Sequence, residues 1–296
     1  MHSQLIVPPH PALAPWIYPT LVVGFPGGCL SRIPAAMSPA LILFARGGGW
    51  RTDAAGRRLH RYPRAVIAGP CLTPRFTEID AGGVFVSMLF RPGLLAEALG
   101  PSVAELRDRT FALDEVFPPG DVRRMLEHID EEQQPARWVV LLQDLVRRAL
   151  RVGSDARQAQ HATGSMVRLF EPAEAQAAAL SVGLRQFERR LNRAYGANLR
   201  DLRRVARFGF ALPKLFAGAG RRGHVARIAQ EFGYYDQAHM DRDFAALTGY
   251  SPRTLVKSSA GDDPGFWLYR IGQPDFRSLF LPEDVDSVQE RVFVRP

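Results

Sequence analysis

The stretch VARIAQEFGYYDQAHMDRDFAAL constrains the fold of this chain more than any other part of its sequence. Val225, Ile228 and Phe232 are spaced three or four residues apart, so they form one apolar stripe on a predicted helix. Gly233 follows where a helix commonly ends in a left-handed cap, and Asp236 is suited to cap a second helix. We therefore expect two short helices joined by a tight turn.

In the second of these helices, Met240, Phe244 and Leu247 point inward, which leaves the opposite side for other contacts. Helix, glycine turn and capped helix is the plan of a helix-turn-helix unit, in which the second helix enters the major groove of DNA. Arginine pairs well with guanine and glutamine with adenine, although an arginine flanked by two aspartates can also form only a surface ion pair. The candidate base-reading residues on this face are Gln237, Ala238, Asp241 and Arg242.

The segment EAQAAALSVGLRQFERRLNRAYG repeats the same plan upstream. Ala177 and Leu180 are the expected core residues of its first helix, and Phe187 and Leu191 anchor its second. Gly183 stands where a capping serine is expected. The candidate base-reading residues of this unit are Arg185, Glu188, Arg189 and Asn192.

Between the two units, LRDLRRVARFGFALPKLF predicts a linker helix. Its 18 residues would measure about 27 Å, close to the roughly 34 Å that separates successive major grooves on one face of DNA. Pro213 removes one backbone hydrogen bond, so we expect the helix to bend there.

Positive charge is concentrated in this same region. Between Ala162 and Ala260 there are 16 Arg or Lys and 8 Asp or Glu, so that segment carries the whole net charge of +8. Such a distribution is typical of a part that binds a polyanion, although a basic surface can also serve only solubility. The arginines expected to contact DNA phosphates are Arg190, Arg193, Arg203, Arg204, Arg221 and Arg222.

The N-terminal part has a different pattern. Between Leu5 and Leu113, short apolar runs are broken by glycine and proline, which predicts strands of a sandwich or barrel. DVRRMLEHIDEE and ARWVVLLQDLVRRAL predict helices that either cover this sheet or pair with a second subunit. We place a domain boundary near residues 152–162. The tail after Gly261 is rich in aromatic side chains, so we expect it to pack back on the protein.

The segment IAQEFGYYDQAHMDRDF, with TGYSP after it, resembles the signature of AraC-type (AraC/XylS) transcriptional regulators. The upstream RQFERRL, the spacing from Arg207 to Ala211 and Gly196 are similar to the rest of that DNA-binding domain. The departures are Gly183 in place of the usual serine, Leu191 in place of the usual phenylalanine, and Pro213 in the linker helix. The N-terminal part resembles, more weakly, the β-rich domain of some regulators of this family.

The resemblance implies an α+β chain with a cupin-like or jelly-roll N-terminal domain and an all-α domain of two helix-turn-helix units joined by a linker helix. It implies binding of double-stranded DNA, with a sensing or dimerising N-terminal domain, so a small-molecule effector and a homodimer are its expected partners. No apolar run is long enough to span a membrane, and we expect a cytoplasmic protein. The expected parts are a β-rich regulatory domain at 1–118, connecting helices at 119–160, the DNA-binding domain at 161–260 and the tail at 261–296.

Other classes of function fit the sequence poorly. The seven histidines are scattered, without the close pairs of a metal site, and His239 has no partner at ligand spacing. The two cysteines, Cys29 and Cys71, form no disulfide framework. There is no nucleophile-elbow motif and no phosphate-binding loop, so we expect neither catalytic residues nor a cofactor. Two alternatives stay open: a constitutive DNA-binding protein without an effector, and a small-molecule enzyme fused to a DNA-binding domain.

Overall fold

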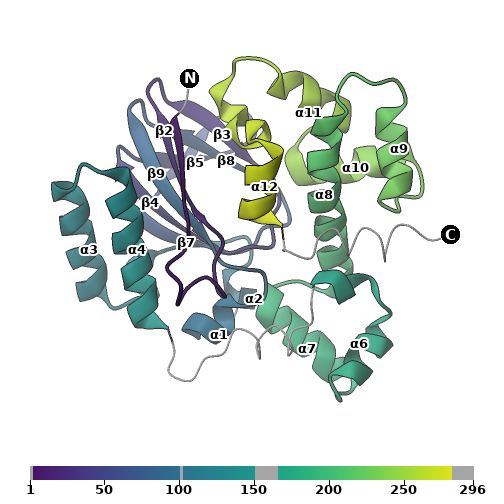
Figure 1. Cartoon of the computed structure of the whole chain (residues 1–296), viewed down its shortest axis with the longest axis horizontal. Coiled ribbons are helices and arrows are strands. Elements are labelled where there is room, and N and C mark those ends of the chain that lie inside the picture. Colours follow the sequence, from purple (N-terminus) through teal and green to yellow (C-terminus); the bar gives the residue numbers. More distant parts are fainter. Residues whose placement is uncertain (1–2, 101–102, 151–165, 282–296) are drawn as a thin grey trace.

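The computed structural model describes residues 3–100, 103–150 and 166–281 (Figure 1). The strands all fall in the first half of the chain, and the described residues after them are helical, as the sequence predicts. The expected boundary near residues 152–162 lies outside the described residues, as does the end of the tail beyond residue 281. No helix in the described ranges is long and apolar enough to cross a membrane.

Two antiparallel sheets form the N-terminal half. The larger has the order β1-β2-β9-β4-β7-β10, formed by Ser3–Val7, Thr20–Phe25, Gly83–Leu89, Ala40–Arg46, Ala65–Ala68 and Thr110–Ala112. The smaller has the order β3-β8-β5-β6, formed by Cys29–Ile33, Arg75–Ile79, Gly49–Thr52 and Arg58–Arg61. Three short helices flank β10 along the chain: α1 (Leu95–Leu99) and α2 (Val103–Leu106) precede it, and η1 (Leu113–Glu115) follows it.

Alternation along the strands gives the larger sheet two apolar faces. In β9, Phe85 belongs to one hydrophobic cluster, whereas Val86 and Met88 belong to another. The second cluster is completed by α3 (Pro119–Glu131) and α4 (Pro135–Ala149), which lie against this sheet in Figure 1. Of the two sequence alternatives for these helices, the structure shows the first: within this chain they cover the sheet.

The helical half begins with η2 (Met166–Phe170). It contains two pairs of short helices on either side of one long helix, as predicted. The pairs are α6 (Ala173–Ala179) with α7 (Leu184–Tyr195), and α9 (His224–Glu231) with α10 (Gln237–Thr248). The long helix is α8 (Leu199–Ala217), and α11 (Pro252–Ser259) follows α10. Helix α8 continues through Pro213 for 19 residues, about 28 Å.

The start of the tail packs back on the sheets, as its aromatic content predicts. It forms η3 (Pro264–Arg270) and α12 (Gln273–Phe280). Phe266, Trp267 and Tyr269 are buried, and the indole Nε1 of Trp267 donates a hydrogen bond of 2.8 Å to Ser31 Oγ on β3. The tail, the two sheets and the helical half therefore share one hydrophobic core.

Candidate nucleic-acid interface

The second helix pair, α9 and α10, has the geometry of a helix-turn-helix unit. Ile228, Ala229 and Phe232 are buried on α9, and Met240, Phe244 and Leu247 are fully buried on α10. Gly233 has a φ of +66°, the left-handed conformation that ends the first helix. Asp236 caps α10, because its carboxylate accepts a hydrogen bond of 2.6 Å from the backbone N–H of His239.

The outer face of α10 presents most of the predicted base-reading residues to solvent. Ala238 and Arg242 are exposed and Gln237 is half-buried. Arg242 forms no ion pair with any described residue, so its guanidinium group is available. Asp241 is half-buried, and its Oδ1 is covered without a hydrogen-bond partner in the described part of the chain.

Tyr235 is a surface residue of this unit that sequence reasoning missed. It directly precedes the capping Asp236, and 93% of its surface is exposed. It is by far the most exposed large hydrophobic residue in the described ranges. Such exposure is unusual for an aromatic side chain, because most of them bury their rings. The position of Tyr235 directly before the capping Asp236 is the sequence feature that could have identified it as a surface residue.

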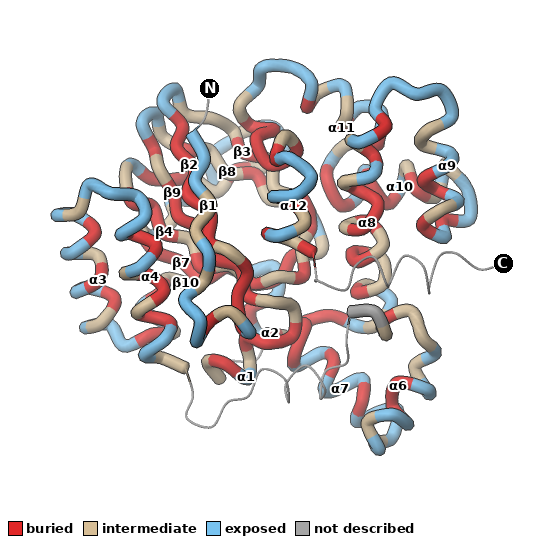
Figure 2. The backbone as a smooth tube through the Cα atoms, viewed as in Figure 1, coloured by how far each residue is buried: buried red, intermediate tan, exposed pale blue. Residues whose placement is uncertain are grey.

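The first helix pair, α6 and α7, repeats this arrangement. Ala177, Phe187 and Leu191 are buried, as predicted. Gly183 is the N-cap of α7 with an extended backbone (φ −71°, ψ 155°) and supplies no side-chain cap. All four candidate base-reading residues are exposed, and Figure 2 shows the alternation of buried and exposed positions along α7; they are Arg185, Glu188, Arg189 and Asn192.

The six arginines predicted to contact phosphates fall into two groups. Arg190, Arg193, Arg221 and Arg222 are exposed and have no protein partner among the described residues.

Arg203 and Arg204 form the second group, because their guanidinium groups have partners inside the domain. Arg203 donates hydrogen bonds to the backbone carbonyls of Leu169 and Glu171, and burial together with the nearby Arg207 cation lowers its pKa. Arg204 Nε lies 2.7 Å from Asp243 Oδ1. These two residues therefore position elements of the domain.

The Arg204–Asp243 pair fixes the recognition helix α10 on the linker helix α8. The Asp243 side chain is only 10% exposed and that of Arg204 36%. His239 Nε2 lies 3.7 Å from the other carboxylate oxygen of Asp243, and the His239 ring meets Tyr234 edge-on at 5.3 Å. From α8, the Arg207 guanidinium lies over the ring of Tyr234 at 5.3 Å, and burial raises the pKa of that phenol. His239 thus has a structural environment, and no group of three or more metal-ligating side chains occurs in the described ranges.

The N-terminal half contacts both units at equivalent positions, just after each predicted recognition helix. After α10, Arg32 on β3 donates a hydrogen bond of 2.9 Å to the Tyr250 hydroxyl and lies 2.9 Å from Asp263. After α7, Arg107 donates a hydrogen bond of 3.2 Å to the carbonyl of Gly196. Gly196 has a φ of +70°, and a Cβ there would lie 2.9 Å from the Val103 carbonyl oxygen, so only glycine fits this contact.

Comparison with known proteins agrees with this geometry. A model of the helix-turn-helix domain family matches residues 176–258, which span α6 to α11. No curated protein matches the chain.

Several solved structures are similar to the chain. ToxT from Vibrio cholerae is 10% identical with a TM-score of 0.44, over 88% of this chain and 99% of that chain. ToxT with bound unsaturated fatty acid is 9% identical with a TM-score of 0.40, over 85% and 92%. The AraC-like transcriptional activator CuxR is 14% identical with a TM-score of 0.25, over 69% and 93%. All three TM-scores lie below 0.5. The family match and the geometry of the two helix pairs show that the chain carries a helix-turn-helix domain, whose signature motif resembles that of AraC-type regulators.

Proposed function

We propose that this chain is a transcriptional regulator that binds specific sequences of double-stranded DNA with both helix-turn-helix units. The observation that carries the proposal is the set of exposed arginines without protein partners on the outer faces of α7 and α10. A cation that forms no internal ion pair can be neutralised by phosphate or can pair with a base edge. The proposal involves no catalysis and no cofactor.

In this proposal, the two recognition helices read bases. Arg242 and Gln237 on α10, and Arg185 and Arg189 on α7, contact base edges in two major grooves. Glu188 accepts from cytosine or holds the arginines beside it, and Asn192, Ala238 and Tyr235 complete the two surfaces. Asp241, whose Oδ1 is covered, is left out of direct base reading.

The phosphate contacts come from the four exposed arginines that have no partner among the described residues. Arg190 and Arg193 extend from α7, and Arg221 and Arg222 precede α9. Each phosphate that is neutralised releases counterions, so binding weakens as the salt concentration rises. Arg203 and Arg204 act indirectly, through the positions of α8 and α10.

The N-terminal sheets serve, in our proposal, as a regulatory domain of this cytoplasmic protein. Arg32 on β3 and Arg107 after α2 contact the residues that follow α10 and α7, and so fix how far apart the two recognition helices lie. A change in the sheets is therefore transmitted to both units. A small-molecule effector and a second copy of the chain are the partners that would use this route.

The test is selection of bound sequences from random duplexes by the full chain, followed by affinity measurements on the selected and on unrelated DNA. Arg242→Ala should weaken binding to the selected site by about 1–3 kcal/mol and relax the preference at one base pair. Arg123→Ala, an exposed arginine on α3, is the matched control and should change neither. Equal weakening of Arg242→Ala on selected and unrelated DNA would contradict base reading.

A further inference from the structure

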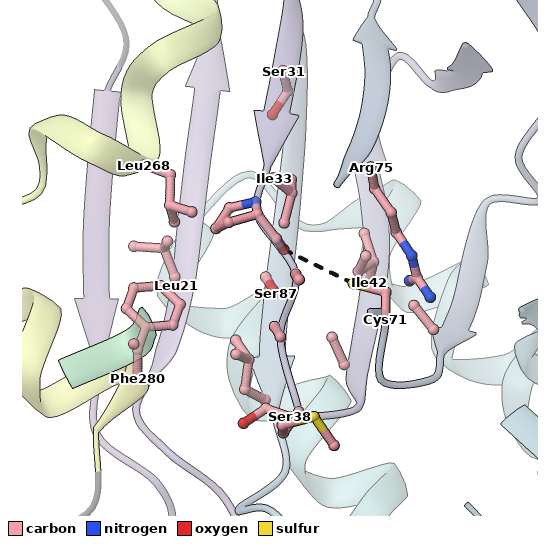
Figure 3. Close-up of a pocket in the computed structure, with 18 of the residues that line it drawn as sticks. Leu21, Ser31, Ile33, Ser38, Ile42, Cys71, Arg75, Ser87, Leu268 and Phe280 are labelled. Atoms are coloured by element: carbon pink, nitrogen blue, oxygen red, sulfur yellow. Dashed lines mark hydrogen bonds between the residues drawn. The ribbon is translucent and has the colours of Figure 1, made fainter. Parts of the chain in front are cut away.

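A cavity of about 220 Å³ lies where the two sheets, the linker helix α8 and the tail meet (Figure 3). Its centre faces β2, β9 and β4, where Leu21 and Ile42 flank Ser87 in the strand register. An apolar cavity of roughly 150 Å³ is large enough to hold benzene. This space therefore accommodates a small organic molecule.

The lining of the cavity is almost entirely apolar. Arg75 is the one charged side chain among the described residues that line it. Arg75 belongs to β8 of the smaller sheet, and its Nη2 donates a hydrogen bond of 2.8 Å to the carbonyl of Gly69. The Cys71 thiol likewise has a partner, the Pro34 carbonyl at 3.8 Å. A carboxylate beside Ser87 would lie between Leu21 and Ile42 of the larger sheet, with no cation at either neighbouring position, and burial of an unpaired charge is strongly unfavourable.

Ser87 is one of several hydroxyl-bearing side chains in the lining. It comes from the middle of β9, between two apolar neighbours on adjacent strands. Its hydroxyl forms no hydrogen bond with the described residues. Polar groups in such surroundings are normally hydrogen-bonded, so the hydroxyl indicates one polar atom on an otherwise apolar occupant.

The tail supplies one wall of this cavity and α8 another. Trp267, Leu268, Phe276 and Phe280 come from η3 and α12, and Phe208 is among the lining residues of α8. Hydrogen bonds join the tail to strand β3 and to helix α8. Trp267 donates to Ser31 on β3.

A second bond joins the tail to the linker helix, because Gln273 Nε2 donates a hydrogen bond of 2.8 Å to the Pro213 carbonyl of α8. An occupant of the cavity would therefore touch the sheets, the tail and the helix that joins the two DNA-binding units.

We propose that this cavity is a binding site for a small, neutral, largely apolar molecule with one hydrogen-bonding group, which meets Ser87, and that Phe280 on the tail limits its length. The binding site itself does not depend on DNA binding. Its use as an effector site rests on the proposed function, because α8 and the tail connect it to both helix-turn-helix units.

The experiment uses the full chain and N-phenyl-1-naphthylamine, a neutral apolar fluorophore. The dye should bind saturably at one site per chain, and n-alkanols should displace it. Each added methylene should tighten displacement roughly fourfold until the cavity is full. At pH 8, decanoate should displace roughly tenfold less well than decanol, because Ser87 and its apolar neighbours on β2 and β4 offer the charge no cation. Absence of saturable binding, or a preference for decanoate, would overturn the proposal.

Three variants locate the site. Ser87→Ala should weaken decanol displacement about two- to tenfold while dye binding is unchanged, because one hydrogen bond is lost. Ser87→Leu should abolish dye binding by filling the space, whereas Ser278→Leu, at an exposed position on α12, should not.

In Phe280→Ala, the alkanol that displaces the dye best should have a longer chain than the one that displaces it best from the wild type. Unchanged behaviour of all three cavity variants would show that the dye binds elsewhere and would refute the site. Ser87→Ala and Phe280→Ala keep the test decisive if Ser87→Leu fails to fold.

Measurements with the selected DNA separate this site from the proposed function. Decanol binding by a chain that binds no specific DNA would refute the proposed regulator and support the cavity site. Specific DNA binding by a chain that binds neither dye nor alkanol would refute the cavity site alone.

Discussion

Replacing Arg204 with methionine tests whether this arginine positions the recognition helix or contacts DNA. Methionine keeps much of the apolar stem and removes the charge. The Arg204–Asp243 separation is 2.7 Å, and the aspartate is 10% exposed against 36% for the arginine. Loss of one partner costs about 0–1 kcal/mol for exposed pairs and about 3–5 kcal/mol for buried pairs. For this half-covered pair we expect the free energy of unfolding to fall by about 2 kcal/mol.

The assay combines urea unfolding with DNA affinity at several salt concentrations. Arg204→Met/Asp243→Asn should recover part of the lost stability, because no unpaired carboxylate remains buried. DNA binding by Arg204→Met should weaken while its salt dependence stays unchanged. Arg190→Met is the matched control: it should leave the unfolding free energy unchanged and lower the salt slope by about 0.9, the value for one phosphate.

A positioning role for Arg204 would be refuted if Arg204→Met behaved like Arg190→Met. A stability change below about 0.5 kcal/mol, together with a reduced salt slope, would show that Arg204 contacts phosphate, as the sequence alone suggested.

Three further predictions concern the caps, the docking contact and the thiols. Gly183→Ser should raise the unfolding free energy by about 0.5 kcal/mol, because a side-chain cap is added at an extended position with open space around it; a loss of stability would contradict this. Gly196→Ala should cost at least about 1–2 kcal/mol, since alanine is strained at a φ of +70° and meets the Val103 carbonyl; an unchanged urea midpoint would argue against the contact. Burial raises the pKa of Cys29 to about 12 and also raises that of Cys71, so iodoacetamide at pH 8 should modify neither thiol until urea unfolds the chain; rapid modification of the native chain, followed by mass spectrometry, would be inconsistent with that burial.

The helix-turn-helix units were predictable because their signals are local. The apolar stripe of α9, the left-handed Gly233 and the capping Asp236 lie within a dozen residues, and each has one dominant structural role. The packing of the tail was also predictable, since an aromatic-rich segment such as that containing Trp267 does not stay in water. Its partner Ser31 was not, because it lies 236 residues away.

The roles of charged side chains depended on tertiary contacts that no local pattern contains. Arg203 and Arg190 look alike in the sequence, but only Arg203 meets the backbone carbonyls of the segment before α6. The contact between Arg32 and Tyr250 joins positions 218 residues apart. The cavity, whose lining comes from strands, α8 and the tail, could likewise be found only in the assembled fold.

The central claim is that α7 and α10 read two separate parts of one DNA site. Selection from random duplexes by the wild-type chain, Arg189→Ala and Arg242→Ala tests it most directly. We predict two enriched blocks about 10 base pairs apart, with Arg189→Ala relaxing one block and Arg242→Ala the other. A single enriched block, or relaxation of the same block by both substitutions, would contradict the account.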